Sequence, residues 1–207
     1  ALSTDKACAP INLYGATKLC SDKLFVAANN IVGKRNLKFC IVRYGNVDGS
    51  RGSIIPFFLK QKKEGFLTIT DPSMTRFSID LQQGINLVLK AINEPVVGGE
   101  IIVPKIPSYR ITDLAKAICG NCKIKIVGIR PGEKIHEQMI TENDSYNTFE
   151  TDDKYVILPS HDKIRRDYYL NQKNYKSVKN GFSYDSLKNP NFLSIPQIKK
   201  IIQKFSN

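Results

Sequence analysis

Several features are missing from this sequence, and each absence narrows the class of protein. No apolar run approaches the ~18 residues that a helix needs to cross a bilayer. The first residues contain no basic segment followed by an apolar core, so they do not read as a secretory signal peptide. We therefore expect a cytoplasmic protein without a membrane partner. No internal repeat or low-complexity linker interrupts the chain.

The sequence also lacks the cysteine pattern of a structural zinc site. Cys119 and Cys122 form a lone C-x-x-C, and a four-thiolate site needs two further ligands. A thioredoxin-like site places its first cysteine at a helix amino end, where the helix dipole favours the thiolate. Here the pair follows a helix expected at 111–118. We expect these cysteines to be structural and expect no metal, and the odd cysteine count fits a reducing compartment.

No dense basic run or aromatic ladder accompanies the net charge of +12. The lysines are scattered through every segment, whereas nucleic-acid-binding proteins concentrate them on one face or helix. We therefore expect no nucleic-acid partner. A modest positive field would still suit a substrate that carries two phosphates.

A glycine-rich turn of the form G-x-x-G-x-x-G after a strand, which would hold the pyrophosphate of a dinucleotide, is absent as well. Gly45, Gly49 and Gly52 fall in a different loop. The chain opens on Ala1 without a methionine, and its first residues read as the end of a strand. These features predict a fragment that lacks its own dinucleotide-binding half.

What the sequence does contain is an alternation of helices and strands, which is typical of the α/β class. Residues 1–50 are expected to be the remainder of a Rossmann-like parallel sheet. Residues 51–207 are expected to be mainly a smaller substrate-binding lobe, with one or more segments returning to the sheet. Residues 162–180 read as a long polar loop. The expected helices are 10–32, 54–63, 79–92, 111–118 and 195–205, and the expected strands are 38–44, 66–70, 100–104 and 123–129.

Candidate catalytic residues lie near the start of the chain. Tyr14 and Lys18 are four residues apart on an expected helix, which places them on one face. A nearby ammonium favours the phenolate, so Lys18 would help Tyr14 act as a general base. About ten residues earlier, Thr4, Asp5 and Lys6 follow an apparent strand, at the sheet edge where α/β proteins bind ligands. Taken alone, Asp5 and Lys6 would read as a solvated turn.

These motifs, and others in order along the chain, resemble the inverting UDP-N-acetylglucosamine 4,6-dehydratases. That family belongs to the extended short-chain dehydrogenase/reductases and is similar to polysaccharide-biosynthesis proteins of the CapD type. Two positions depart from its pattern: Asp48 stands where an apolar residue is expected, and Ser78 where an aromatic one is usual. The matching segments are residues 1–7, 10–18, 43–47, 49–53, 69–72, 74–77, 103–107, 128–134, 136–137 and 181–184.

The resemblance implies a mechanism. Tyr14 would take the proton of the sugar C4 hydroxyl, Thr4 would hydrogen-bond that hydroxyl, and Lys18 would hold the nicotinamide ribose. Lys6 would then remove the C5 proton, and Asp5 would protonate the departing C6 hydroxyl. The product would be a 4-keto-6-deoxy sugar with C5 inverted.

The resemblance also implies substrate contacts. Asn46, Arg76 and Arg130 would bind the diphosphate, since guanidinium groups match phosphate oxygens bidentately. Glu133 would contact the nucleotide ribose. Without the resemblance, each of these residues would read equally well as a surface polar or charged group. His136 reads as a structural imidazole.

Cofactor and partners follow from the same resemblance. NADP would bind mainly in the missing amino-terminal half, with contacts from Tyr14 and Lys18, and the intact protein is expected to be a homo-oligomer. Two alternatives remain open: an inactive fragment that binds a nucleotide sugar, and a nucleotide-sugar 4-epimerase. An epimerase needs Thr4, Tyr14 and Lys18 but not Asp5 and Lys6. The Thr-Asp-Lys sequence therefore favours the dehydratase.

Overall fold

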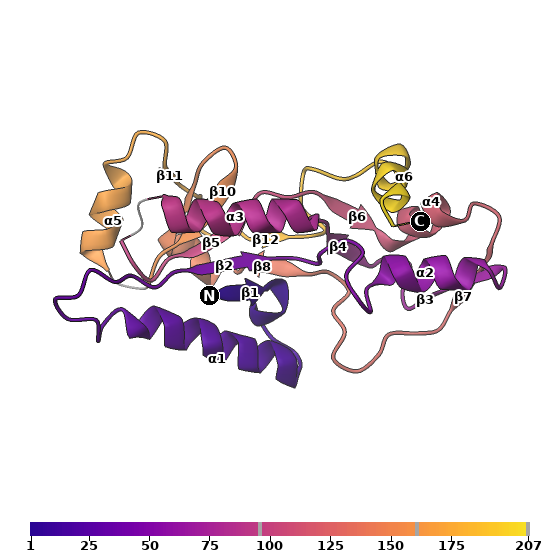
Figure 1. The fold of residues 1–207 in the computed structure, drawn as a ribbon, viewed down its shortest axis with the longest axis horizontal. Helices are drawn as coiled ribbons and strands as arrows, with labels where there is room; N and C mark the ends of the chain where they lie inside the picture. The colour runs from indigo at the N-terminus through magenta and orange to yellow at the C-terminus, as the bar shows by residue number, and fades with distance from the viewer. Residues whose placement is uncertain (95–96, 160–161, 206–207) are drawn as a thin grey trace. The chain divides into compact units, whose positions relative to one another are not determined.

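The computed structural model describes residues 1–94, 97–159 and 162–205, and its elements are labelled in Figure 1. The chain divides into two compact units, each assembled from separate segments of the sequence. Unit 1 contains residues 1–44, 83–105 and 138–184, and unit 2 contains residues 45–82, 106–137 and 185–207. Each unit has strands and packed apolar side chains of its own.

Unit 1 is built on a six-stranded sheet. Its first three strands are parallel, with Ser3 opposite Arg43 and Ile41 opposite Ile101, and the other three are antiparallel to their neighbours. The parallel strands and the alternating helices confirm the α/β class. In sheet order, the strands are β1 (Leu2–Thr4), β2 (Ile41–Tyr44), β5 (Ile101–Pro104), β10 (Lys154–Ile157), β9 (Thr148–Glu150) and β11 (Lys176–Ser177).

Two long helices connect the parallel strands of this sheet. α1 (Leu13–Ala28) begins where the Asn12 side chain accepts a hydrogen bond from the Gly15 amide, an N-cap that satisfies one of the free donors of the first turn. The expected helix at 10–32 was therefore placed correctly but drawn too long at both ends. α3 (Leu81–Asn93) packs Leu87 and Ala91 against the sheet residues Val42 and Ile102.

The region expected to be a long loop, 162–180, was predicted wrongly. It contains α5 (Lys163–Leu170) and the short strand β11. Asp162 caps α5 by accepting a hydrogen bond from the Arg165 amide, and Tyr169 packs with Phe149 and Val156. Two of the apolar residues of this helix, Ile164 and Leu170, are exposed, so its apolar residues do not follow a helical period.

Unit 2 has its own core of packed apolar side chains. Its elements are α2 (Ile54–Lys62), β3 (Phe66–Ile69), β4 (Thr75–Phe77), β6 (Ser108–Arg110), α4 (Ile111–Ile118), β7 (Lys123–Ile126) and α6 (Ile195–Gln203). Phe58 from α2, Leu67 from β3, Leu114 from α4 and Ile198 from α6 belong to one buried cluster. β3 pairs in parallel with β7, and β4 pairs antiparallel with β6.

Besides α5, the four-residue strand β10 and several shorter elements were not predicted from the sequence. β4, β6, β9 and β11 have two or three residues each, too few for an alternating pattern to stand out. Cys119 and Cys122 form a disulfide directly after α4, a bond that the sequence analysis did not predict. The remaining short elements are η1 (Asp5–Ala7), η2 (Asn143–Asn147), β8 (Gln138–Ile140) and β12 (Tyr184–Asp185).

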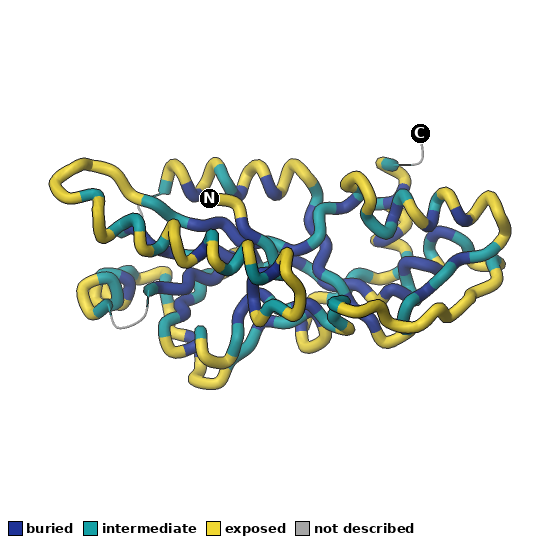
Figure 2. Tube along the Cα trace, turned by 90° about the horizontal axis from the view of Figure 1, so that it is seen from below, coloured by how far each residue is buried: buried dark blue, intermediate teal, exposed yellow. Residues whose placement is uncertain are grey.

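Burial is uneven along unit 1. The strands of the sheet are buried over much of their length, whereas the helices alternate between buried and exposed residues (Figure 2). On α1, Leu13 is 80% exposed and Leu24 is 70% exposed. Among the described residues, no helix combines the length and the apolar character needed to cross a membrane.

We expect the chain to self-associate when it is produced alone. Apart from β2, no described strand is hydrogen-bonded to β1, so one edge of β1 is open to pairing with another strand. The exposed leucines of α1 add apolar surface. Replacing Leu13 and Leu24 together by lysine should shift light scattering of the purified chain toward the monomer mass, and Lys23→Gln on the same helix should not. A monodisperse monomer with cooperative thermal unfolding for the unaltered chain would contradict this prediction.

Candidate active site

Three adjacent residues at the end of β1 form a hydrogen-bonded group. Thr4 ends the strand and caps η1, and its hydroxyl donates to Oδ1 of Asp5 at 3.0 Å. The ammonium of Lys6 donates to the same oxygen, also at 3.0 Å. Asp5 is fully buried and its Oδ2 has no hydrogen-bond partner, whereas the Lys6 side chain is 35% exposed. The solvated-turn interpretation is therefore wrong for Asp5.

The Tyr14 and Lys18 pair lies on α1, which packs directly on this group. The Lys18 ammonium donates to the backbone carbonyl of Leu2 in β1 at 2.8 Å, so the helix is attached to the strand that ends at Thr4. Tyr14, one turn earlier, is 57% exposed. A Cβ atom built on Gly15 would lie 2.3 Å from the carbonyl oxygen of Lys6. Glycine is thus required where the helix passes η1.

A buried polar network lies one turn further along the same helix. The carboxylate of Asp22 accepts a hydrogen bond from Ser3 at 2.8 Å and one from the Arg43 guanidinium at 3.0 Å, and all three residues are buried. Arg43 also donates to the carbonyl of Met139 at 2.9 Å. One carboxylate on α1 therefore joins β1 and β2.

Analysis of the sequence missed this network, although two signals pointed to it. Asp22 follows Tyr14 and Lys18 at the same four-residue interval, so it shares their helix face. Arg43 interrupts an apolar strand, where a charged side chain needs a partner. Its partner is distant in the sequence, and only the parallel pairing of β1 and β2 brings Ser3 opposite Arg43.

The proposed substrate residues belong to unit 2 and form two groups. The first is the loop after β2. The Asn46 carbonyl accepts from the Ile79 amide, and the Asp48 amide donates to the Ile79 carbonyl, so the loop runs beside the residues that follow β4. Asp48 and Ser78, the two departures from the family pattern, are buried and hydrogen-bonded to each other at 2.6 Å.

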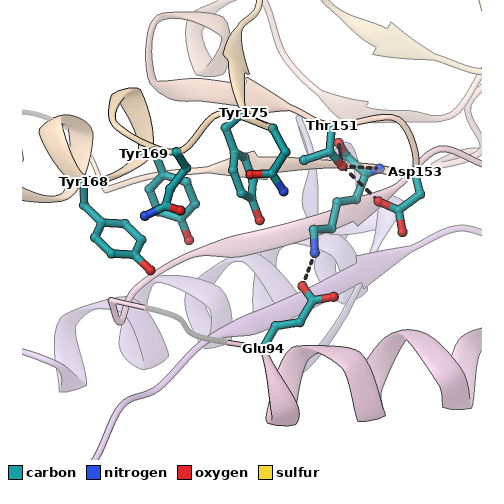
Figure 3. Close-up of a pocket in the computed structure, with 9 residues that line it drawn as sticks. Glu94, Thr151, Asp153, Tyr168, Tyr169 and Tyr175 are labelled. Atoms are coloured by element: carbon teal, nitrogen blue, oxygen red, sulfur yellow. Dashed lines mark hydrogen bonds and ion pairs between the residues drawn. The ribbon is translucent and has the colours of Figure 1, made fainter.

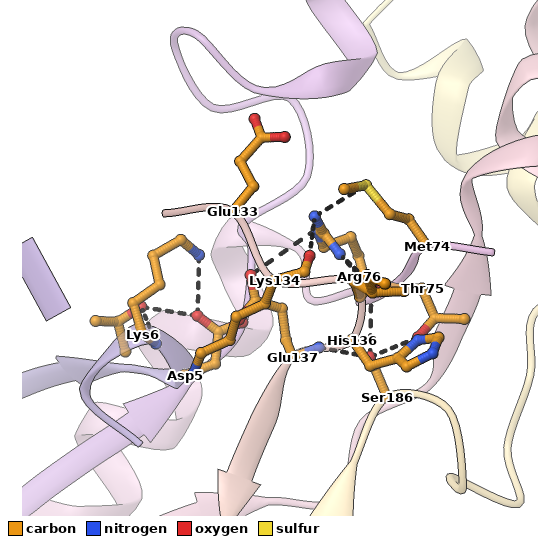
Figure 4. A network of polar contacts seen from close by, with 12 residues as sticks. Asp5, Lys6, Met74, Thr75, Arg76, Glu133, Lys134, His136, Glu137 and Ser186 are labelled. Atoms are coloured by element: carbon orange, nitrogen blue, oxygen red, sulfur yellow. Dashed lines mark hydrogen bonds and ion pairs between the residues drawn. The ribbon is translucent and has the colours of Figure 1, made fainter. Parts of the chain in front are cut away.

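The second group is the segment 130–137, which Arg76 holds. The Arg76 guanidinium donates to the carbonyls of Lys134 and Ile135 and to the carbonyl of Thr75, and it lies 3.9 Å from Glu137 (Figure 4). The guanidinium also contacts the sulfur of Met74 at 3.4 Å. Arg76 is thus mostly buried and directed at the protein backbone.

Arg130 and Glu133 lie at the other end of this segment. They form an ion pair at 3.5 Å, and the Glu133 amide donates to the Arg130 carbonyl in a turn. The Arg130 side chain is 68% exposed, so this ion pair lies at the surface.

His136 has a structural role, as expected. Its Nδ1 is 2.8 Å from the Thr75 hydroxyl, which in turn contacts the Ser186 hydroxyl. Burial lowers the pKa of His136, because desolvation disfavours the imidazolium.

A separate polar pocket of about 270 Å³ lies in unit 1 (Figure 3). Tyr168, Tyr169 and Tyr175 form part of its wall. Its charged lining residues are already paired: Lys154 with Glu94, and Asp153 with Lys90. The described wall therefore leaves no charged group for a ligand, and we assign the pocket no role. Over the described part of the chain, no cluster of three metal-binding side chains occurs.

Comparison with known proteins identifies the family to which this chain belongs. Residues 1–159 match the family described as "Polysaccharide biosynthesis protein". The chain is 54% identical over 209 residues to the UDP-N-acetylglucosamine 4,6-dehydratase (inverting) of Campylobacter jejuni subsp. jejuni serotype O:2, covering 98% of this chain and 62% of that protein. It is 42% identical over 161 residues to a UDP-glucose 4-epimerase of Rickettsia canadensis, covering 75% of this chain and 47% of that protein.

A solved structure agrees with the fold over nearly the whole chain. The X-ray structure of Pen from Bacillus thuringiensis superposes with a TM-score of 0.84 at 34% identity, covering 99% of this chain and 61% of that one. The chain thus spans somewhat less than two thirds of the length of both the Campylobacter protein and Pen.

Removing the Asp22 carboxylate should strongly destabilise unit 1. Asp22→Ala leaves the Arg43 guanidinium buried without its ionic partner, and breaking a buried pair in this way typically costs about 3–5 kcal/mol. Asp153→Ala breaks the solvent-exposed pair with Lys90 and serves as the control, with an expected loss below about 1 kcal/mol. Urea unfolding followed by circular dichroism measures both. Equal losses for the two variants would show that the network does not stabilise the fold.

Proposed function

Because the chain belongs to the polysaccharide biosynthesis protein family, we propose that the protein containing it is a UDP-N-acetylglucosamine 4,6-dehydratase that inverts C5. One observation carries the proposal: Thr4, Asp5 and Lys6 are hydrogen-bonded together at the end of β1, with Lys18 attached to the same strand. An epimerase has no use for a buried carboxylate and a lysine beside its threonine. The Campylobacter relative bears the name of this activity.

Oxidation at C4 is assigned to Thr4, Tyr14 and Lys18. Thr4 would orient the C4 hydroxyl, and Tyr14 would take its proton. Lys18 uses one N–H donor on the Leu2 carbonyl, and its other donors suit the hydroxyls of a nicotinamide ribose. When bound, NADP supplies the chemistry of accepting hydride from C4 and returning it to C6. Most of its contacts would come from residues outside this chain.

Elimination is assigned to Asp5 and Lys6. Once C4 is a ketone the C5 proton is acidic, and the neutral amine of Lys6 would remove it. Asp5 would give its proton to the C6 hydroxyl, which leaves as water. The 3.0 Å hydrogen bond between these side chains supports a shared proton, because transfer along it converts the ion pair into a neutral base and a neutral acid.

Substrate binding is assigned to Asn46, Arg76, Arg130 and Glu133. The exposed guanidinium of Arg130 would bind the diphosphate, and Glu133 would accept hydrogen bonds from the ribose. Arg76 would reach a phosphate only by exchanging one of its backbone contacts, so its main effect would be to hold the segment that carries Arg130. The exposed apolar side chains of α1 support a homo-oligomer for the intact protein.

The chain alone should be inactive, because its sequence has no glycine-rich turn for the cofactor pyrophosphate. Incubation with UDP-N-acetylglucosamine and NADP should give no 4-keto product by mass spectrometry. Supplying the amino-terminal part of the full-length protein should restore product formation. Turnover by the chain alone near the enzymatic median of ~10 per second would overturn this expectation.

The two halves of the reaction should separate by mutation in the full-length protein. Lys6→Ala should spare hydride transfer from C4, seen as single-turnover absorbance of the reduced nicotinamide. It should slow exchange of the C5 proton with solvent deuterium by about 10²–10⁴-fold, the usual contribution of a general base. Tyr14→Phe should abolish both steps, because C5 becomes acidic only after C4 is oxidised.

Lys23→Ala, which removes an exposed lysine from the same helix as Tyr14, is the matched control and should behave as the unaltered protein. If Lys6→Ala exchanges C5 at the normal rate, Lys6 is not the base. If no keto sugar forms even in the unaltered full-length protein, the proposed function itself is wrong.

A further inference from the structure

Asp48 and Ser78 form a buried acid–hydroxyl pair that the proposed mechanism does not use. The Ser78 hydroxyl donates to Oδ2 of Asp48 at 2.6 Å, and the two residues are 3% and 8% exposed, respectively. Burying a carboxylate costs free energy unless it is hydrogen-bonded, and here the Ser78 hydroxyl supplies that hydrogen bond. Both residues replace side chains that the family pattern makes apolar or aromatic.

The pair joins the two segments that carry proposed diphosphate ligands. Asp48 is two residues after Asn46, and Ser78 is two residues after Arg76. Two backbone hydrogen bonds between the loop and Ile79 lie beside the pair. The Asp48 amide donates to the Ile79 carbonyl at 2.9 Å, and the Ile79 amide donates to the Asn46 carbonyl at 3.3 Å. The side-chain bond adds a further connection between the loop and the end of β4.

The end of α6 covers the same loop. The Lys204 ammonium donates to Asp80 at 3.2 Å. The ring of Phe205 lies against Gly49, where an added Cβ would come within 2.1 Å of it. Asp80 and Lys204 are therefore the charged groups that face Asp48 from the neighbouring elements, and both act on its charge.

We propose that the Asp48–Ser78 hydrogen bond is a positioning contact that holds the Asn46 loop against the Arg76 strand and so sets the affinity for the diphosphate of the nucleotide sugar. The inference rests on the proposed function and extends it, because it makes substrate affinity depend on the protonation of one buried carboxyl. The ionised carboxylate accepts the hydroxyl proton in a charge-assisted bond, which is roughly twice as strong as a neutral one. Protonation of Asp48 loosens the loop.

The charge state of Asp48 changes within a useful range of pH. Desolvation raises the pKa of Asp48 to about 6, with the Ser78 hydrogen bond and Lys204 opposing the rise and Asp80 adding to it. Above this pKa the carboxylate predominates, so the hydrogen bond to Ser78 is at its strongest and the Asn46 loop is held against the Arg76 strand. As pH falls through the pKa, the affinity for substrate decreases. A nucleotide-sugar diphosphate is a diester and does not titrate here, so a step in affinity comes from the protein.

The test measures binding of UDP-N-acetylglucosamine by calorimetry between about pH 5 and pH 7.5, in full-length protein carrying Tyr14→Phe to prevent turnover. In this background the dissociation constant should rise about fivefold as pH falls, with a midpoint near the Asp48 pKa. Adding Asp48→Asn should abolish the step and fix the affinity at the weak, acidic value. Ser78→Ala should likewise weaken binding at high pH and remove the step, because the hydrogen bond whose strength depends on the charge of Asp48 is then absent.

Neighbouring charges give variants with opposite expected signs. Asp80→Asn should move the midpoint down, and Lys204→Met should move it up. Glu64→Gln, an exposed acid in the same unit, should leave it unchanged. His136 also titrates in this unit. If the pH step survives Asp48→Asn, the step belongs to His136 and the proposal is overturned.

Thermal unfolding of each variant shows that it is folded. In a double-mutant cycle, Asp48→Val with Ser78→Ala should lose no more affinity than either change alone, and additive losses would contradict a direct coupling. Failure of the unaltered full-length protein to bind UDP-N-acetylglucosamine would refute the proposed function together with this inference. Normal binding with an unchanged pH step in Asp48→Asn would refute this inference alone.

Discussion

The geometry of unit 1 depends on one buried carboxylate, that of Asp22. It accepts hydrogen bonds from Ser3 of β1 and Arg43 of β2, and so fixes the rotation and height of α1 on the parallel strands. Tyr14 and Lys18 stand on the same helix face as Asp22, and Thr4 directly follows Ser3. An apolar contact in this place would tolerate sliding, because dispersion and burial have little directional preference. Hydrogen bonds to a charged group have fixed distances and angles, so they define the register of the proposed catalytic residues.

In unit 2, hydrogen bonds and ion pairs of buried side chains likewise hold the irregular segments in place. The loop after β2 and the segment 130–137 have little regular secondary structure, so side chains hold them: the Asp48–Ser78 pair for the first, and Arg76 with Glu137 for the second. Loops placed in this way present polar atoms to a ligand at a small entropic cost on binding.

Much of the fold follows from local patterns in the sequence. The helix and strand of residues 13–44 were predicted because apolar residues at helical spacing are followed there by an apolar strand. The α5 helix, the strand β10 and most of the two- and three-residue strands were missed because their signals are short or polar. At the site, Asp5 and Lys6 were recognisable from family motifs, but Asp22 and Arg43 were not, since their meeting depends on strand pairing. Asp48 and Ser78 stood out singly as departures, and only their proximity in space explains both.

The tight passage of α1 over η1 has an evolutionary consequence. Gly15 lets the helix approach so closely that a single added carbon would collide with the Lys6 backbone, so the spacing between Tyr14 and the strand end is fixed by the main chain. A lineage cannot acquire a new reaction by moving the helix. It can exchange the side chains at positions 5 and 6, which project from an unchanged backbone. Exchange of these two side chains would therefore change the groups presented beside Tyr14 while the helix stays in place.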